Sequence, residues 1–179
     1  LGGLVPSDDA GEHIDSRRET GEILRELGPP VTEIRAGIIV GPGSAAFEVM
    51  RDLVLNLPVM ITPRWVRASS PPIALSNLLV YLERIALCED AAGKIYEAAG
   101  AEVCTYEEMM HQLAAATGKR SPLIIPVPVL TPKLSAYWLA LTTAVPANIA
   151  RALIGGLKND FTADDKEWRR LVPQELLSV

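Results

Sequence analysis

The stretch VTEIRAGIIVGPGS, residues 31–44, decides how the rest of the sequence is interpreted. From Ala36 onward it is too apolar for a half-exposed strand, and it predicts a central parallel strand over 32–40 that is covered on both faces. A Gly-Pro-Gly turn follows at 41–43. The next residues repeat apolar side chains at helical spacing and predict a helix over 45–56. A buried strand, a tight turn and a helix therefore form the core of the prediction.

The glycine turn allows two interpretations: a phosphate-binding loop, or a loop that follows a late strand of the sheet. Residues 38–46, IIVGPGSAA, match a G-x-G-x-x-A fingerprint, in which the turn directs a helix N-terminus at the pyrophosphate of a dinucleotide. Against this, Pro42 removes an N–H from a loop that would have to offer such groups. The next apolar segment ends in Thr62, Pro63 and Arg64 rather than in an acidic residue for the ribose. Arg64 would suit a 2′-phosphate, so the match by itself stays open.

The remaining pattern predicts an α/β class. Helices are expected over 13–27, with an apolar face of Ile23, Leu24 and Leu27, and after a Ser76 cap. A T-x-x-E capping box at Thr105 and Glu108 opens another helix, and a cap at Thr162 a last one. Short apolar segments at 59–62, 73–75 and 93–98 predict strands between them. Because helices and strands alternate over the first 117 residues, a mainly parallel sheet is expected.

Composition and spacing exclude several classes of protein. The formal net charge of -5, with Lys and Arg scattered along the chain, argues against nucleic-acid binding, which needs a concentrated basic face. Cys88 and Cys104 lack CxxC spacing and are expected to be reduced, buried residues of a cytoplasmic protein. His111 has no second ligand at metal spacing, so no metal site is expected.

One segment raises the question of membrane contact. Residues 134–150, LSAYWLALTTAVPANIA, are uncharged over 17 positions, which is shorter than the roughly 20 that a spanning helix needs. Pro146 interrupts the segment. A buried or interface-packed helix pair is the favoured interpretation, and the sequence does not favour membrane contact, with peripheral contact through Tyr137 and Trp138 as the alternative.

The opening residues LGGLVP are apolar and glycine-rich, and no initiator Met precedes them. They are typical of the end of a buried strand, so the chain is expected to be a fragment, with a processed terminus as the alternative.

Several stretches together resemble a known family. They are IRAGIIVGPG (34–43), PPIALSNLLVYL (71–82), GKIYEAAGAEVCTYEEMM (93–110), LGGL, PVMITPRWV and IPVPVLTP. In these, essentially the whole chain resembles the C-terminal half of an atypical, extended short-chain dehydrogenase/reductase, of the NAD(P)-binding, NmrA-like or nucleoside-diphosphate-sugar epimerase-like bacterial group.

The resemblance implies the C-terminal part of a Rossmann-type parallel sheet plus a small, mainly helical substrate lobe. Residues 1–62 would supply late strands and helices of the NAD(P)-binding domain, and residues 63–179 the interleaved completion of the sheet and the substrate lobe. The phosphate-binding half would lie upstream of Leu1, and GPGSAA would be the turn after the sixth strand.

The family's functional positions carry over with substitutions. Gly2 and Gly3 stand where a catalytic Ser is expected, and His13 and Arg17 stand where the family has Tyr-x-x-x-Lys. His13 and Arg17 are therefore the catalytic candidates; the alternative makes His13 a helix-start residue and Arg17 a surface charge. By the resemblance, NAD or NADP would be bound by a set of small and apolar residues: Gly2, Gly3, Ala36, Gly37 and Ile38.

Candidates on the substrate side combine aromatic, apolar and basic residues: Phe47, Met50, Arg51, Arg64 and Trp65. An aromatic ring beside an Arg suits a planar or anionic ligand, but it is as often plain architecture. Arg35 is expected to be structural, either pairing with a carboxylate or capping a loop, rather than a substrate ligand. The implied function is that of an NAD(P)-dependent oxidoreductase or epimerase-like protein acting on an unknown small molecule. The alternative is a catalytically silent NAD(P)-binding sensor or assembly protein, and a homo-oligomer stays open.

Overall fold

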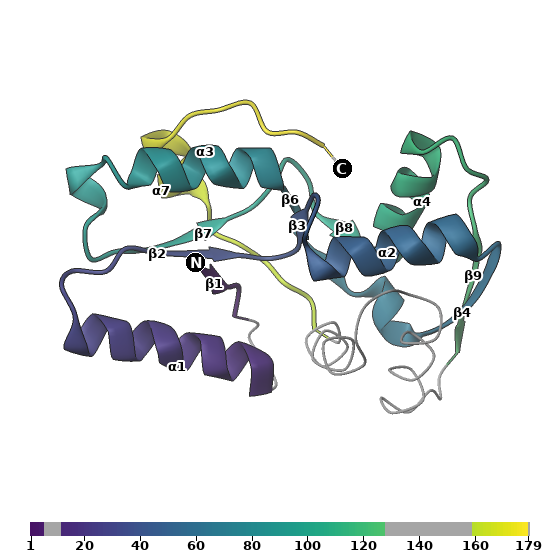
Figure 1. The fold of residues 1–179 in the computed structure, drawn as a ribbon, viewed down its shortest axis with the longest axis horizontal. Coiled ribbons are helices and arrows are strands. Elements are labelled where there is room, and N and C mark those ends of the chain that lie inside the picture. Colours follow the sequence, from purple (N-terminus) through teal and green to yellow (C-terminus); the bar gives the residue numbers. More distant parts are fainter. Residues whose placement is uncertain (6–11, 128–158, 179) are drawn as a thin grey trace.

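The computed structural model describes residues 1–5, 12–127 and 159–178. Figure 1 shows an elongated molecule with a packed unit toward each end of its long axis. One unit contains a three-stranded sheet, and the other contains a two-stranded sheet backed by helices. This arrangement confirms the expected α/β class.

The three-stranded sheet is parallel throughout, in the order β1 (Gly2–Gly3), β2 (Glu33–Ala36) and β7 (Ile95–Ala98). Alternate residues of β2 face opposite sides. Ile34 and Ala36 pack into an apolar core with α3 (Leu75–Ile85) and α7 (Lys166–Leu171), while Glu33 faces α1 (Glu12–Leu27). The expectation of a central parallel strand covered on both faces is therefore confirmed.

The expected strand over 32–40 is shorter in the structure, because the chain leaves the sheet at Gly37. After β2, residues Ile39–Val40 form β3, which pairs with β6 (Ile73–Ala74) in a separate two-stranded ladder. A Cβ at Gly37 would lie 3.0 Å from Ser70 Oγ and 3.3 Å from the Pro71 carbonyl oxygen. This close approach of another segment ends β2.

The second unit packs two helices on one face of a small sheet. Strands β4 (Val59–Pro63) and β9 (Leu123–Val127) run parallel, and α2 (Ala45–Asn56) and α4 (Tyr106–Ala116) share a core with them. A 3-10 turn, η1 (Arg64–Arg67), follows β4, and a short antiparallel ladder joins β5 (Ser69–Ser70) to β8 (Cys104–Thr105). The predicted helix over 45–56 is confirmed.

Helix starts were predicted with mixed success. The capping box is confirmed, since the Thr105 hydroxyl accepts from Glu108 N and the Glu108 carboxylate accepts from Thr105 N. The Ser76 cap is wrong, because β6 runs directly into α3, which begins at Leu75. The Thr162 cap is also wrong, since Phe161 N donates to Ser69 O and Asp164 N to Glu97, so α7 begins only at Lys166.

The expected apolar face of α1 is not its packed face. Ile23, Leu24 and Leu27 are 47%, 52% and 83% exposed, whereas Ile14 and Gly21 are buried. Gly21 brings the helix so close to the sheet that a Cβ would lie 2.8 Å from a carboxylate oxygen of Glu33. Close backbone approach, rather than the apolar stripe, therefore sets the side on which α1 packs.

Both cysteines are free, Cys104 buried and Cys88 half-buried. The helix pair expected around Pro146 lies outside the described residues. Within the part of the chain that the structure describes, no helix has the length and apolar character needed to cross a bilayer.

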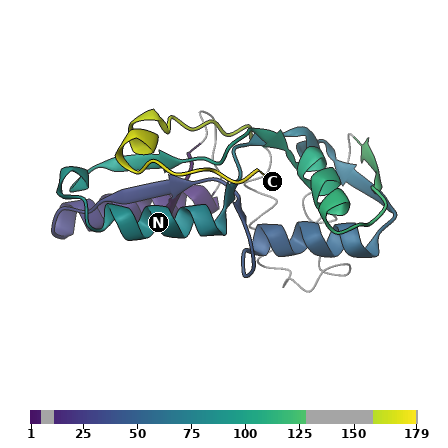
Figure 2. The same cartoon turned by 90° about the horizontal axis from the view of Figure 1, so that it is seen from above.

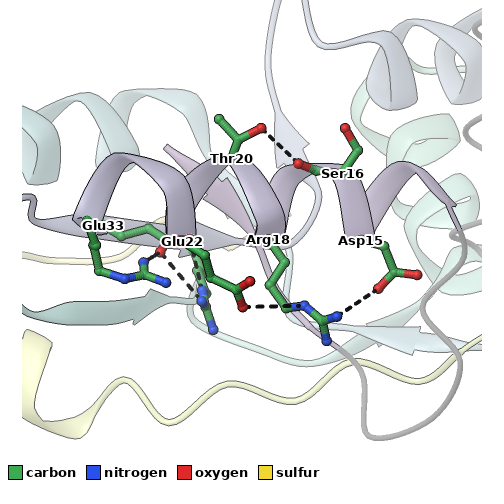
Figure 3. A network of polar contacts seen from close by, with 8 residues as sticks. Asp15, Ser16, Arg18, Thr20, Glu22 and Glu33 are labelled. Carbon is green, nitrogen blue, oxygen red and sulfur yellow. Dashed lines mark hydrogen bonds and ion pairs between the residues drawn. The ribbon is translucent and has the colours of Figure 1, made fainter. Parts of the chain in front are cut away.

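A buried carboxylate links α1 to the sheet. Glu33 is 6% exposed, accepts from Arg35 Nε at 3.0 Å and forms an ion pair with Arg25 of α1 (Figure 3). Burial raises the pKa of the Glu33 carboxyl, but hydrogen bonds and charges from Arg35 and Arg25 outweigh it and hold the pKa below its usual value. The expected pairing of Arg35 with a carboxylate is confirmed.

We expect Glu33→Gln to lower the free energy of unfolding by about 2 to 3 kcal/mol at neutral pH, because it leaves two partly buried guanidinium groups without a counter-charge. Since the folded pKa is lowered, the stabilisation is present above the unfolded pKa of roughly 4.3 and is lost as pH falls below it. Urea unfolding against pH would show the two proteins converging in acid. Glu22→Gln, which removes an exposed partner of Arg18, is the matched control with a small expected effect.

The C-terminal residues are fastened to α3 through one buried amide. Asn77 Nδ2 donates to Gln174 Oε1 at 2.9 Å and to Glu175 O at 2.8 Å, and Asn77 Oδ1 accepts from Leu177 N at 3.0 Å. Nearby, Trp168 is 1% exposed, and its ring centroid lies 4.4 Å from that of Tyr81. The tail is therefore part of the sheet unit's core.

Asn77→Ala should lower the free energy of unfolding by roughly 1 to 3 kcal/mol, because it removes three hydrogen bonds from buried groups. Amide hydrogen exchange should accelerate first over residues 172–178. Ser76→Ala, at an exposed neighbouring position, provides the control. Unchanged hydrogen exchange over residues 172–178 in Asn77→Ala would show that Asn77 does not hold the C-terminal residues in place.

Candidate functional site

The carboxyl ends of three parallel strands meet at one edge of the sheet. Gly3 lies opposite Ala36 and Ala36 opposite Ala98, so these three positions form the edge itself. In open α/β sheets this edge is the usual position of a ligand. Ala36 to Ile38, which were predicted to contact the cofactor, therefore lie where the topology favours a site.

Two of the predicted site residues are brought together at this edge. The nearest atom to a Cβ built on Gly3 is Arg17 Cδ at 3.9 Å, so the exposed side chain of Arg17 extends from α1 alongside β1. His13 lies one turn earlier in α1, and its side chain is outside the described part of the structure. The spacing of the two residues thus places both on the helix that flanks β1.

Gly2 and Gly37 are explained by packing within the protein. A Cβ at Gly2 would lie 2.5 Å from Glu33 Oε1, inside the ion cluster with Arg25 and Arg35. A Cβ at Gly37 would press on Ser70 and Leu4, as well as on the Pro71 carbonyl. Gly3 differs from these two glycines. A Cβ built there would meet only Arg17 Cδ, at an ordinary contact distance of 3.9 Å.

The backbone at this edge is already largely paired. Leu4 N donates to Ala36 O at 3.0 Å, and Ile73 N donates to Ile38 O at 2.8 Å. Both Ala36 and Ile38 are buried. Since their carbonyl oxygens already accept hydrogen bonds within the chain, Ala36 and Ile38 are better suited to apolar contact with a ligand than to hydrogen bonding with it.

The Gly-Pro-Gly turn does not present an open phosphate cradle. Ser44 caps α2, with its hydroxyl accepting from Phe47 N, and the Glu48 carboxylate accepts from Gly43 N at 3.3 Å. Arg51 neutralises Glu48 in an ion pair. Because Ser44 and Glu48 already accept N–H groups at the positive end of α2, a phosphate there would have to displace them. The geometry supports the alternative interpretation, in which GPGSAA is a turn after a late strand of the sheet.

The predicted substrate residues lie in the second unit, on α2 and η1. Met50 is buried in the core with Val66, and Arg51 is engaged by Glu48 and Asp52. Phe47 is half-buried and Arg64 is exposed on η1. The ring of Trp65 packs edge-on against Tyr106, with centroids 5.7 Å apart. Trp65 therefore has a structural contact of its own, and burial raises the pKa of Tyr106 beside it.

Residues that the sequence analysis did not select also border the sheet edge. Asp160 accepts from Ser69 N at 2.7 Å and from Ser69 Oγ at 2.9 Å, which holds its pKa below the usual value. Phe161 packs against Leu4 and Ile14. Residues 160–164 thus pass across the carboxyl edge and form part of its wall. Because Asp160 and Ser69 are 91 residues apart in the sequence, no local sequence pattern could have predicted this contact.

The described residues contain no group of three or more His, Cys, Asp and Glu side chains placed to hold an ion. His111 instead contacts Ser121 and lies 4.0 Å from Glu107.

No family model matches the sequence. A mitochondrial protein of Dictyostelium discoideum, subunit 9 of the NADH dehydrogenase (ubiquinone) 1 alpha subcomplex, is 30% identical over 126 residues. The match covers 69% of this chain and 35% of that protein. The chain thus spans about a third of the length of this curated relative.

Solved structures share the fold at lower identity. An NADPH-dependent quinone oxidoreductase from Escherichia coli superposes with a TM-score of 0.71 at 18% identity, over 99% of this chain and 60% of the other. A triphenylmethane reductase from Citrobacter gives 0.67 at 14%, over 99% and 60%. A nucleoside-diphosphate-sugar epimerase from Staphylococcus aureus gives 0.66 at 15%, over 94% and 59%.

These matches agree with the parallel sheet, its helices on both faces and the smaller second unit. The chain therefore has the Rossmann-type fold of the NAD(P)-binding, NmrA-like and epimerase-like reductases of the extended short-chain dehydrogenase/reductase group, over part of their length.

Proposed function

We propose that this chain forms the nicotinamide-end strands and the substrate lobe of an NAD(P)-dependent oxidoreductase or epimerase-like protein acting on a small molecule. One observation carries the proposal. Gly3 and Ala36 lie side by side at the carboxyl edge of the parallel sheet, with Arg17 extending along Gly3. This is the edge where open α/β sheets bind their ligands.

The described residues fit one end of NAD or NADP. Gly3 leaves room beside the sheet edge, and the exposed guanidinium of Arg17 supplies a cation for ribose hydroxyls or a phosphate. Ala36 and Ile38 offer apolar contact. When bound, the cofactor supplies hydride transfer. His13, one turn before Arg17, would exchange a proton with the substrate near neutral pH.

The phosphates of the cofactor would be held elsewhere. The α2 N-terminus carries Glu48, so the proposal assigns the phosphate loop to residues outside this chain's Gly-Pro-Gly turn. In the same division, residues 1–62 contribute late strands and helices of the cofactor domain, and residues 63–179 complete the sheet and supply the substrate lobe. We place the protein in the cytoplasm on the basis of its free cysteines.

A second candidate function is supported by the residues at the motif positions. Gly2 and Gly3 carry no hydroxyl, and Arg17 replaces a Lys whose pKa could be tuned. A protein that binds NAD(P) without transferring hydride, as a sensor or assembly protein, would need no such groups. The curated relative is a subunit of a larger assembly.

Arg17→Ala should weaken NADPH binding roughly tenfold to a hundredfold in the full-length gene product, because a charge-assisted hydrogen bond is lost. The unfolding temperature should stay the same, since Arg17 is exposed. Fluorescence titration of NADPH gives the affinity. Arg18→Ala is the matched control, because Arg18 pairs with Asp15 and Glu22 on the helix surface (Figure 3). Equal affinities in both variants would remove Arg17 from the site.

Ser44→Ala should cost about 1 kcal/mol of stability through loss of the α2 cap and leave the NADPH affinity unchanged. Thermal unfolding and the same titration measure the two quantities. A tenfold loss of affinity would instead make the Gly-Pro-Gly turn the phosphate loop and overturn the assignment above.

Turnover separates the two candidate functions. NADPH oxidation is followed with quinone and carbonyl acceptors for the parent protein and for His13→Ala. Oxidation in the parent that falls in His13→Ala supports the enzyme. NADPH binding in the parent with no oxidation of any acceptor favours the sensor.

A further inference from the structure

Strands β4 and β9 present an apolar surface to solvent. We call this the sheet patch: Val59, Ile61, Leu123 and Ile125, which are 50%, 56%, 59% and 43% exposed. The register pairs Val59 with Leu123 and Ile61 with Ile125, so the four side chains lie together on one face. Met60 and Ile124 point to the opposite face and enter the core. Parallel strands are normally covered on both faces, and among the described residues of this chain the pair is covered on one.

Helix α1 presents a second apolar surface. We call this the helix stripe: Ile23, Leu24 and Leu27, of which Ile23 and Leu27 lie on the side of α1 turned away from its buried Gly21. Their spacing of one, three and four residues places them on one face of the helix. An amphipathic helix that exposes its apolar face is the layer that a one-sided sheet lacks.

The charges around the two surfaces are opposite. Exposed basic residues lie next to both ends of the sheet patch: Arg64 and Arg67 after β4, and Lys119 and Arg120 before β9. Glu19 and Glu26 flank Ile23 on the helix stripe and are exposed. Within the described part of the chain, none of these six residues takes part in an ion pair.

We infer that the helix stripe of one copy of this chain packs on the sheet patch of a second copy. The lengths are compatible, because the helix stripe with its acidic residues, from Glu19 to Leu27, extends over about 12 Å and a five-residue strand over about 17 Å. The acidic residues of the helix stripe then meet the basic ends of the sheet patch. Pairing like with like is disfavoured, since two helix stripes would bring carboxylates together and two sheet patches would bring cations together.

The positions of the two surfaces allow the contact to close. In both views α1 and the β4–β9 pair lie toward opposite ends of the long axis (Figures 1 and 2). Two copies lying antiparallel can therefore make the same contact twice, which gives a closed two-fold dimer. The contact is small and polar at its rim, so the association is weak and weakens further in salt.

Sedimentation velocity over a range of protein concentrations tests the inference. The parent chain should self-associate, and Ile61→Glu and Ile23→Glu should each weaken the association roughly tenfold or more, because each buries a charge in an apolar contact. Leu87→Glu is the matched control. Leu87 is 82% exposed and lies outside both surfaces. Circular dichroism checks that every variant folds.

Mixing the variants is the decisive experiment. Ile61→Glu retains an intact helix stripe and Ile23→Glu an intact sheet patch, so an equimolar mixture should recover one contact and form a heterodimer. Loss of association in only one of the two variants would mean a like-with-like interface and overturn the inference. A parent chain that stays monomeric, or that instead binds anionic vesicles through Ile61, would overturn it as well.

Discussion

The buried carboxylate of Glu33 sets the geometry on which the rest of the sheet unit depends. It binds Arg35 on its own strand and Arg25 on α1, and Gly2 and Gly21 leave the space that it needs. A charge taken out of water is strongly destabilising without such partners, and here the two arginines hold the carboxylate in place. That arrangement fixes the rotation of α1 about its axis. The same rotation brings Arg17 beside Gly3 and leaves the helix stripe facing solvent.

The Gly-Pro-Gly turn shows how one short pattern can arise from two different physical requirements. A phosphate loop needs free N–H groups at a helix N-terminus. Here Ser44 and Glu48 already accept such groups from within the chain. The positive end of α2 is thus satisfied by a carboxylate four residues into the helix. Such an internal anion makes the turn a stable corner between the two units.

The sequence predicted features whose causes are local. Helix 45–56 follows from apolar spacing and a Ser cap, and the Thr105–Glu108 box is a contact between neighbours. The end of β2 at Gly37 could not be predicted, because Ser70 and Pro71 cause it from a distant part of the chain. The same holds for Asp160 at the sheet edge, whose partner is Ser69. For α1, periodicity revealed an apolar face, but the packed side was chosen by Gly21 and the buried Glu33.

The docking of the last helix has a consequence for the order in which the molecule folds. Trp168 fills the space between Tyr81 and Tyr96, and Asn77 holds the residues that follow α7. The core of the sheet unit is therefore incomplete until some of the last residues of this sequence have been synthesised. In contrast, the core of the second unit draws its named members from residues 38–124. During translation the second unit can thus fold first, while the sheet unit still lacks the Trp168 ring that packs against Tyr81 and Tyr96.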